Sequence, residues 1–326
     1  MNTKLLYVLV SDESDIYLEQ ASVSMFSARL HNPQIHITLL MDDLTDKNLI
    51  GQRRELLKPV SEKIVISLDA KYTNKERSRI LKTGARLYVH GDFLFIDCDT
   101  IVAAPLDDID TNPIDLGAVM DCHTTLTHNP YRNMIFRHAQ SINNVLCENE
   151  PYFNSGIILV RDIEANHIFY ERWQTNWKKG LAGGVSMDQP SFSQTNKELN
   201  YPIQEISGIW NCQIRHGMKY WNIAKIIHYL CTNGSSGENA LYFWMQKCVY
   251  QQIKKSGISD DLIPKIQYPF EQLCSCVNVE NAQSLPFHST SCYKTSFFLY
   301  KEHPYLFHLE SVILKIMKKV ARYAKV

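Results

Sequence analysis

The sequence predicts an α/β protein with a mostly parallel central sheet, because short apolar stretches alternate with longer helical patterns through its first hundred residues. The apolar stretches are rich in Val, Ile and Leu, which fits strands that are buried on both faces of a sheet. They are KLLYVLV (4–10), IHITLLM (35–41), KIVISL (63–68) and DFLFID (92–97). The expected helices cover residues 15–30, 45–57 and 75–88.

Later elements follow the same pattern at first. Strands are expected at LGAVMDC (116–122) and FNSGIILVR (153–161), and helices over 162–179 and 188–198, joined by a Gly-rich loop at 181–189. The pattern becomes irregular from about residue 240, and residues 304–326 are helical and basic. Because ligands of parallel sheets bind beyond the carboxyl ends of the strands, Ser11, Asp12 and residues 97–99 are expected on one rim.

Composition excludes several classes of protein. The chain has 326 residues, 45% of them hydrophobic, which is enough for one large domain or two modest ones with a real core. Lys and Arg number 34, as do Asp and Glu, so no overall charge attracts nucleic acid and no nucleic-acid partner is expected. We expect no secretory peptide and no membrane span. The nine cysteines include no metal-type CxxC pair, which favours reduced thiols and a cytoplasmic location.

Two carboxylates, Asp97 and Asp99, end the apolar strand of FLFIDCDTIV (93–102). Positions i and i+2 can converge where a strand opens into a loop. Two carboxylates that lie so near each other repel unless a cation neutralises them. Oxygen ligands suit Mg²⁺ or Mn²⁺, which commonly complete their coordination with substrate phosphates. The alternative is a pair of solvated loop aspartates.

Two enzyme classes place such a pair at a strand end. In haloacid-dehalogenase-type phosphatases the first Asp is a nucleophile, and one residue separates the second Asp from a Thr. Here Thr100 follows Asp99 directly, and a long βα array precedes the motif. Both departures favour a nucleotide-sugar glycosyltransferase over a phosphatase that uses Asp97 as nucleophile.

Over residues 4–231 the chain resembles glycosyltransferase family 8, a retaining group that includes bacterial lipopolysaccharide α-galactosyl- and glucosyltransferases and glycogenin. Six pieces occur in the family's order: VSDE (10–13), SRILKTGARL (78–87), FLFIDCDTIV, YFNSGIILV (152–160), MDQPSF (187–192) and IIHYL (226–230). The resemblance implies a GT-A (Rossmann-like) nucleotide-diphospho-sugar transferase fold with a C-terminal helical extension. It also implies transfer of galactose or glucose from a UDP-sugar to a glycan or lipid-linked glycan, in lipopolysaccharide or other surface polysaccharide synthesis.

The implied domain division is a catalytic domain over 1–235 and a C-terminal extension over 236–326. Within the catalytic domain, residues 1–102 would bind the nucleotide, and residues 103–235 would bind the donor sugar and the acceptor. A non-catalytic nucleotide-sugar binder on the same fold is the remaining alternative.

The resemblance implies that Val10, Ser11 and Asp12 line the uridine pocket and that Cys98 also contacts the donor. Arg79 would face the donor sugar and the diphosphate, which a fork of N–H donors fits well. Two alternatives stay open: Asp12 could cap the following helix, and Arg86 competes with Arg79 for the alignment.

The implied metal ligands are Asp97, Asp99 and His228, with Asp97 also near the ribose and Asp99 the stronger ligand candidate. A histidine after an apolar strand is otherwise a packed core residue. Mn²⁺ accepts mixed oxygen and imidazole ligands better than Mg²⁺, so manganese is the expected ion and magnesium the alternative.

The resemblance implies that Asn154 and Ser155 contact the donor or the acceptor sugar, that Asp188 binds donor hydroxyls, and that Gln189 faces the anomeric carbon. Gly156 would let the backbone approach closely. The alternatives are a strand-entry turn at 154–156 and a helix cap at Asp188, which Pro190 would support.

One departure from the family concerns the diphosphate. Where the family often has a Gly and then a Lys that grips the phosphates, this chain has Cys231 and Gly234. Another cation or glycine backbone amides are expected to take over this contact.

The C-terminal stretch 305–326 carries apolar residues at helical spacing and five basic residues. A basic amphipathic helix can lie on an anionic membrane, so peripheral contact with the inner face of the membrane is expected. The alternative is a terminal helix packed on the body of the protein with a solvated basic face.

Overall fold

The computed structural model describes residues 1–231, 242–272, 284–288 and 290–323. The chain forms two compact units, residues 1–277 and 278–326. The expected domain boundary at 235/236 lies outside the described residues, as does Gly234. The division into a catalytic domain and an extension at that point stays a prediction.

A seven-stranded sheet forms the centre of the first unit, with the strand order β3-β2-β1-β4-β7-β6-β8. Strand β7 runs antiparallel to its neighbours β4 and β6, whereas the other neighbouring strands are parallel. The predicted α/β architecture with a mostly parallel sheet is therefore confirmed. The strands are β1 (Lys4–Leu9), β2 (Ile37–Asp42), β3 (Glu62–Ile66), β4 (Phe93–Ile96), β6 (Leu116–Met120), β7 (Phe153–Val160) and β8 (Gln204–Glu205).

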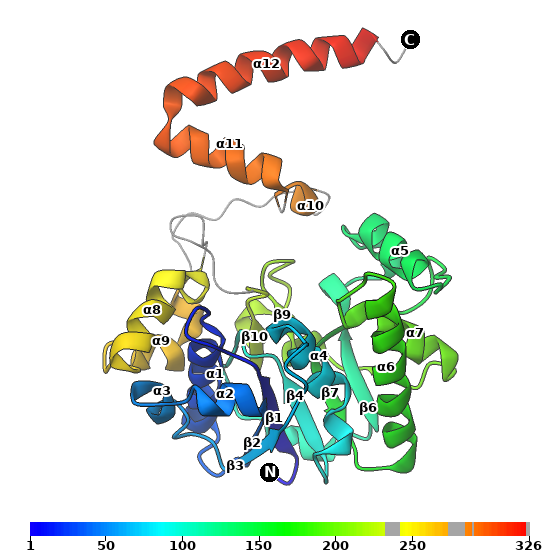
Figure 1. Ribbon diagram of the computed structural model, residues 1–326, viewed down its shortest axis with the longest axis vertical. Helices are drawn as coiled ribbons and strands as arrows, with labels where there is room; N and C mark the ends of the chain where they lie inside the picture. Colours follow the sequence, from blue (N-terminus) through cyan, green and yellow to red (C-terminus); the bar gives the residue numbers. More distant parts are fainter. Residues whose placement is uncertain (232–241, 273–283, 289, 324–326) are drawn as a thin grey trace. The chain divides into compact units, whose positions relative to one another are not determined.

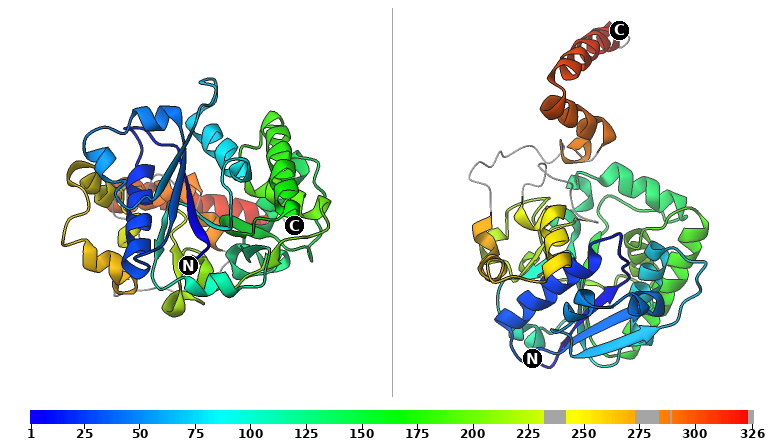
Figure 2. Two further views of the ribbon diagram at one scale, coloured as in Figure 1. Left: turned by 90° about the horizontal axis from the view of Figure 1, so that it is seen from below. Right: turned by 60° about the vertical axis from the view of Figure 1, so that its left-hand side comes forward.

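Helices cover both faces of this sheet (Figures 1 and 2). Side chains alternate between the faces of a strand, so Leu5 and Tyr7 of β1 join one apolar cluster while Leu6 and Val8 join another. The first cluster includes residues of α1 (Tyr17–His31), α8 (Lys247–Ser256) and α9 (Ile263–Gln267). The second includes residues of α4 (Asn74–Thr83), α6 (Glu164–Ala182) and α7 (Gln189–Glu198).

A small second sheet brings a distant segment back to the motif strand. It consists of β5 (Thr100–Val102), β10 (Ile226–His228) and β9 (Cys212–Gln213), with β10 in the middle. Strand β10 pairs antiparallel with β5, and the register sets His228 opposite Thr100. This pairing places the imidazole directly beside the residue that precedes Thr100, Asp99.

Three local expectations differ from the structure. Strand β3 is half-exposed along its length, because it is an edge strand rather than one buried on both faces. The expected helix 45–57 is two short helices, α2 (Asp43–Lys47) and α3 (Gln52–Glu55), separated at Gly51, whose φ of 53° suits glycine. The helix α5 (Arg132–Ser141) was not predicted.

The second unit contains α10 (Leu285–His288), α11 (Ser291–Glu302) and α12 (Pro304–Tyr323). Helices α11 and α12 contact each other, and Ser296 of α11 donates a hydrogen bond to Glu310 of α12. The predicted C-terminal helix is confirmed over its described part. Across the described residues, no helix is both long and apolar enough to cross a bilayer.

Candidate active site

The site lies at the rim where β1 and β4 end. These strands are parallel neighbours, so the residues that follow them emerge at the same edge of the sheet. Residues 10–12 follow β1, and residues 97–99 connect β4 to β5. The structure thus brings the two segments to one rim, as the strand pattern predicts.

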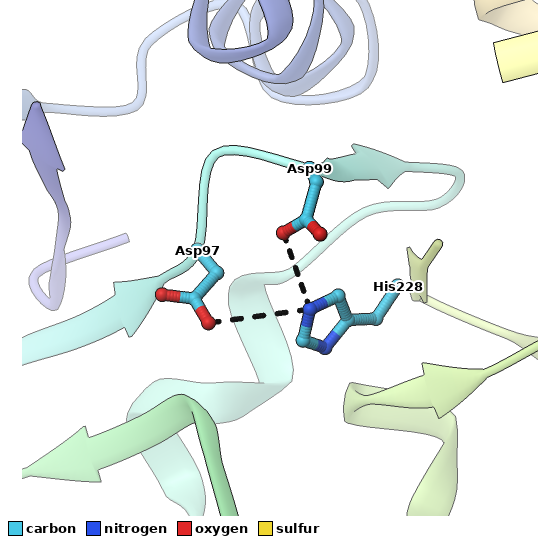
Figure 3. Close-up of side chains that lie close together, drawn as sticks. All are labelled: Asp97, Asp99 and His228. Carbon is cyan, nitrogen blue, oxygen red and sulfur yellow. Dashed lines mark ion pairs between the residues drawn. The ribbon is translucent and has the colours of Figure 1, made fainter. Parts of the chain in front are cut away.

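Asp97, Asp99 and His228 converge at this rim (Figure 3). The Nε2 atom of His228 lies 3.2 Å from Asp99 Oδ1 and 4.0 Å from Asp97 Oδ2. One ligand atom from each residue falls within 4.8 Å of the others. The two carboxylates converge because β4 ends at Ile96 and the chain turns before β5 begins at Thr100.

The second polar atom of each side chain is fixed by another part of the protein. Lys82 Nζ lies 3.2 Å from Asp97 Oδ1, and the backbone N–H of Cys231 donates to Asp99 Oδ2 at 2.6 Å. Asn211 Oδ1 lies 3.0 Å from Nδ1 of His228, which fixes the ring with Nε2 toward the carboxylates. Each of the three residues therefore presents one atom to the centre of the cluster.

The pKa values of these groups show a local excess of negative charge. Burial raises the pKa of Asp97, and neighbouring Asp99 raises it further against the opposing effects of Lys82 and His228. Burial alone would also raise the pKa of Asp99, but His228 and the backbone N–H of Cys231 together outweigh it and the net shift is downward. Burial opposes protonation of His228, yet Asp99 and Asp97 together outweigh it and the pKa of the imidazole is raised. A proton on His228 thus neutralises part of the charge that a cation would neutralise.

This donor set fits a divalent metal. Two carboxylate oxygens and one imidazole nitrogen converge from rigid positions, and three protein ligands leave coordination positions for substrate oxygens. The side chain of Asp97 is 31% exposed, so the cluster is open to a ligand on one side. His228 is buried, but it is not simply a packed core residue.

Gly156 of β7 lies against the cluster. A Cβ atom at this position would lie 2.3 Å from His228 Cε1 and 2.8 Å from Asp97 Oδ2. Only glycine lets two of the candidate ligands approach the strand this closely. The close approach at Gly156 is to protein side chains, and residues 154–156 lie inside a strand rather than in an entry turn.

A second charged cluster surrounds Asp188, the residue that precedes α7. Its Oδ1 lies 2.8 Å from Arg79 Nε, and its Oδ2 lies 2.9 Å from Lys82 Nζ and accepts a hydrogen bond from Ser155 at 2.9 Å. Burial would raise the pKa of Asp188, but Arg79 and then Lys82 hold it well below its ordinary value. The side chain does not cap α7, so the capping alternative is not observed.

Arg79 and Arg86 have different surroundings. Arg79 is partly exposed, with 30% of its side chain accessible, beside Asp188. Arg86 is buried, donates to the carbonyls of Val89 and Gly91, and pairs with Asp162. The structure therefore places Arg79 at the site and Arg86 outside it.

The side chains that follow β1 form hydrogen bonds with nearby protein residues. Ser11 donates to Asp15 and accepts from Arg53, and Asp12 accepts hydrogen bonds from Ser14 and Asn74. Asp12 does not cap α1, whose N-cap is Ile16.

The remaining predicted residues also have defined places. Val10 is buried, and the thiol of Cys98 donates to the carbonyl of Val8, toward β1. Asn154 Oδ1 accepts a hydrogen bond from the amide of Asn211, which also contacts His228, and Gln189 lies beside Tyr152.

Sequence reasoning missed Lys82 and Asn211, which contact the predicted site residues directly. Lys82 had a signal, because it follows Arg79 by three positions on a helix and must share its face. Asn211 had none, because only the pairing of β9 with β10 brings it to His228.

The class of fold follows from comparing this protein with known sequences and structures. No protein-family model and no curated protein matches the sequence. Solved structures do match over most of the chain, and they show that this is a GT-A-like fold.

Two of the matching structures are of a galactosyltransferase, LgtC. Its complex with donor and acceptor sugar analogs has a TM-score of 0.52 and 13% identity, covering 81% of this chain and 100% of that one. An active-site mutant of LgtC has a TM-score of 0.52 and 12% identity, covering 80% of this chain and 99% of that one. Mouse xyloside xylosyltransferase 1 in its apo form has a TM-score of 0.49 and 13% identity, covering 72% of this chain and 100% of that one. The predicted fold is confirmed by the two LgtC structures.

Proposed function

We propose that the protein is a metal-dependent, retaining glycosyltransferase that moves a galactose or glucose unit from a UDP-sugar to a glycan acceptor. Lipopolysaccharide or another surface polysaccharide is the proposed product. The observation that carries the proposal is the convergence of Asp97, Asp99 and His228 beside the buried carboxylate of Asp188. The LgtC structures with the same fold support the choice of reaction.

Asp97, Asp99 and His228 would hold Mn²⁺, with Mg²⁺ as the alternative. When bound, the ion would supply positive charge where the leaving diphosphate develops negative charge. Arg79 adds a second cation at the same place: its Nε faces Asp188, its Nη1 donates to Ser78, and its partly exposed guanidinium suits phosphate oxygens. We propose that Arg79 takes over the diphosphate contact expected from a lysine beyond Cys231.

Val10, Ser11, Asp12 and Cys98 would form the uridine and ribose side of the site. Because the Ser11 hydroxyl is already shared between Asp15 and Arg53, its contribution would come from backbone and shape. The carboxylate of Asp12 is less buried than that hydroxyl and is oriented by Ser14 and Asn74.

The surroundings of Asp188 favour same-face attack over a covalent intermediate. Both oxygens of its carboxylate are engaged by Arg79, Lys82 and Ser155, which lowers its nucleophilicity and orients it as an acceptor for donor hydroxyls. Gln189 is a poor nucleophile and would face the anomeric carbon. Asn154 and Ser155 would complete the sugar side.

The helix α12 supports a peripheral membrane location at the inner face, where a lipid-linked acceptor would be met. Its apolar residues are largely exposed, including Leu309 at 57% and Ile316 at 58%. Lys315, Lys318, Lys319 and Arg322 fall on the opposite side at helical spacing.

The proposal is tested by incubating the protein with UDP-galactose or UDP-glucose and Mn²⁺ and following release of UDP. We expect release that is abolished by EDTA and by Asp99→Asn, with retained anomeric configuration of the product by NMR. Phosphate release from p-nitrophenyl phosphate without nucleotide would favour the phosphatase alternative, with Asp97 as nucleophile. UDP binding without turnover on any glycan acceptor would favour the non-catalytic binder.

A further inference from the structure

Lys82 occupies an unusual position between the two charged clusters of the site. It lies on α4, one helical turn after Arg79, and only 3% of its side chain is exposed. Its Nζ atom lies 3.2 Å from Asp97 Oδ1 and 2.9 Å from Asp188 Oδ2. One ammonium group thus contacts both a candidate metal ligand and the carboxylate assigned to the donor sugar.

Most N–H donors of this ammonium group already have protein partners. An ammonium group has three N–H donors, and two of them meet the carboxylates of Asp97 and Asp188. The group also lies 4.8 Å from the centre of the Phe95 ring, a cation–π distance. Lys82 is therefore a poor candidate for a phosphate ligand, and its contacts are with the protein itself.

The fold alone does not require a lysine here. A buried ammonium loses its hydration, and the position faces the apolar cluster that contains Phe95, where a methionine of similar length could pack. Replacing a whole buried ion pair by apolar groups is often neutral or stabilising for a protein, whereas removing Lys82 alone leaves the carboxylates of Asp97 and Asp188 without this partner. The charge of Lys82 is best explained by what it does to Asp97 and Asp188.

We propose that Lys82 is a positioning residue that joins the metal site to the donor-sugar site, orienting Asp97 and Asp188 through one shared ammonium group. By donating to Asp97 Oδ1 it leaves Oδ2 for the metal, and by donating to Asp188 Oδ2 it fixes that carboxylate relative to the metal. The role toward the sugar rests on the proposed function, whereas the role toward the metal does not.

We expect Lys82→Met to strengthen the binding of Mn²⁺ and to weaken the contribution of the donor sugar to binding. Removing a positive charge beside Asp97 makes the site more negative, and we expect this effect to outweigh the loss of a fixed Asp97 orientation, so the variant should bind Mn²⁺ about fivefold more tightly than the wild type. Asp188 loses one of its fixed partners, so the sugar part of a UDP-hexose should contribute less to binding. A residue that merely filled space would produce neither effect.

The test is calorimetric titration of the full chain with Mn²⁺ alone, and then with UDP and with UDP-glucose or UDP-galactose in the presence of Mn²⁺. In Lys82→Met we expect tighter Mn²⁺ binding and a smaller difference in affinity between UDP and the preferred UDP-hexose. Lys82→Gln, which loses the charge but keeps a donor, should tighten Mn²⁺ binding and preserve more of that difference. It also replaces Lys82→Met if the latter fails to fold.

Arg86→Met is the matched control, because it removes another buried cation near the end of α4 whose partner, Asp162, lies outside the site. It should leave Mn²⁺ affinity unchanged. Unchanged or weaker Mn²⁺ binding by folded Lys82 variants would overturn the inference. Wild-type protein that binds Mn²⁺ but no uridine nucleotide would instead contradict the proposed function, and failure to bind Mn²⁺ would overturn both.

Discussion

At the residue scale, the ionised carboxylate of Asp97 lowers the stability of the folded protein when no cation is bound. Burial and Asp99 raise its pKa more than Lys82 and His228 lower it. A carboxyl group whose pKa is higher in the folded than in the unfolded state destabilises the fold once it ionises. Active sites commonly accept such a loss of stability for the sake of function.

Asp97→Asn is therefore expected to raise the melting temperature of the metal-free protein by about 2 °C near neutral pH. The sign follows from the raised pKa of Asp97: ionisation costs stability above the folded pKa, and asparagine removes that cost. The difference from wild type should shrink as the pH falls through the pKa of Asp97, where the wild-type carboxyl is protonated. Calorimetric melting of both proteins in EDTA over a pH series measures this.

The same variant should lose the increase in melting temperature that Mn²⁺ gives the wild type. A lower melting temperature of metal-free Asp97→Asn at neutral pH would show that the carboxylate serves the fold rather than a cation.

At the scale of elements, the site depends on how closely β7 approaches the ends of β4 and β10. The sequence pattern of each strand is local, so the strands themselves and the rim formed by β1 and β4 could be predicted. The pairing of β10 with β5, which sets His228 opposite Thr100, joins segments that are more than a hundred residues apart. No local pattern encodes this pairing, and only family resemblance indicated His228.

Gly156→Ala tests the close approach. The added methyl group would overlap His228 Cε1 at 2.3 Å and Asp97 Oδ2 at 2.8 Å, so the ligands must move apart. We expect Mn²⁺ affinity to fall by about tenfold or more, with a loss of about 1–3 kcal/mol in unfolding free energy. Isothermal titration and chemical denaturation measure the two quantities.

Gly117→Ala on the neighbouring strand β6 provides the control. Its methyl group would overlap the side chain of Ile206 at 2.7 Å, which lies away from the metal ligands. It should lower stability without changing Mn²⁺ affinity. Equal metal affinity in the two variants would contradict the role assigned to Gly156.

Helix α12 makes a separate prediction about membranes. Truncation of residues 305–326 should abolish sedimentation of the protein with liposomes that contain anionic lipid, because the exposed apolar side and the five basic residues are lost together. Neutral liposomes should bind the full chain weakly. Equal sedimentation of full-length and truncated protein would contradict membrane contact through this helix and favour its alternative as an ordinary terminal helix.

At the scale of the whole molecule, the fold brings together three parts of the candidate site: residues 10–12 after β1, Asp97 and Asp99 after β4, and Asp188 before α7. The shared rim of the first two parts could be predicted from the strand pattern, whereas only the family resemblance indicated Asp188. The contacts between the parts could not be predicted, since Lys82 and Asn211 act on residues that are distant in sequence. The burial of β3 was also misjudged, because position within a sheet is a property of the assembled fold.

The central claim is that Asp97, Asp99 and His228 hold a divalent cation through which a uridine diphosphate is bound. Calorimetric titration of UDP into the protein with Mn²⁺, with EDTA, and with Asp99→Asn in Mn²⁺ tests it most directly. Asparagine at this position can still accept the hydrogen bond from the Cys231 N–H, so the fold should survive. We predict UDP binding with Mn²⁺ that disappears in EDTA and weakens by about tenfold or more in Asp99→Asn. UDP binding of equal strength in EDTA, or no UDP binding by the wild type with Mn²⁺, would contradict the claim.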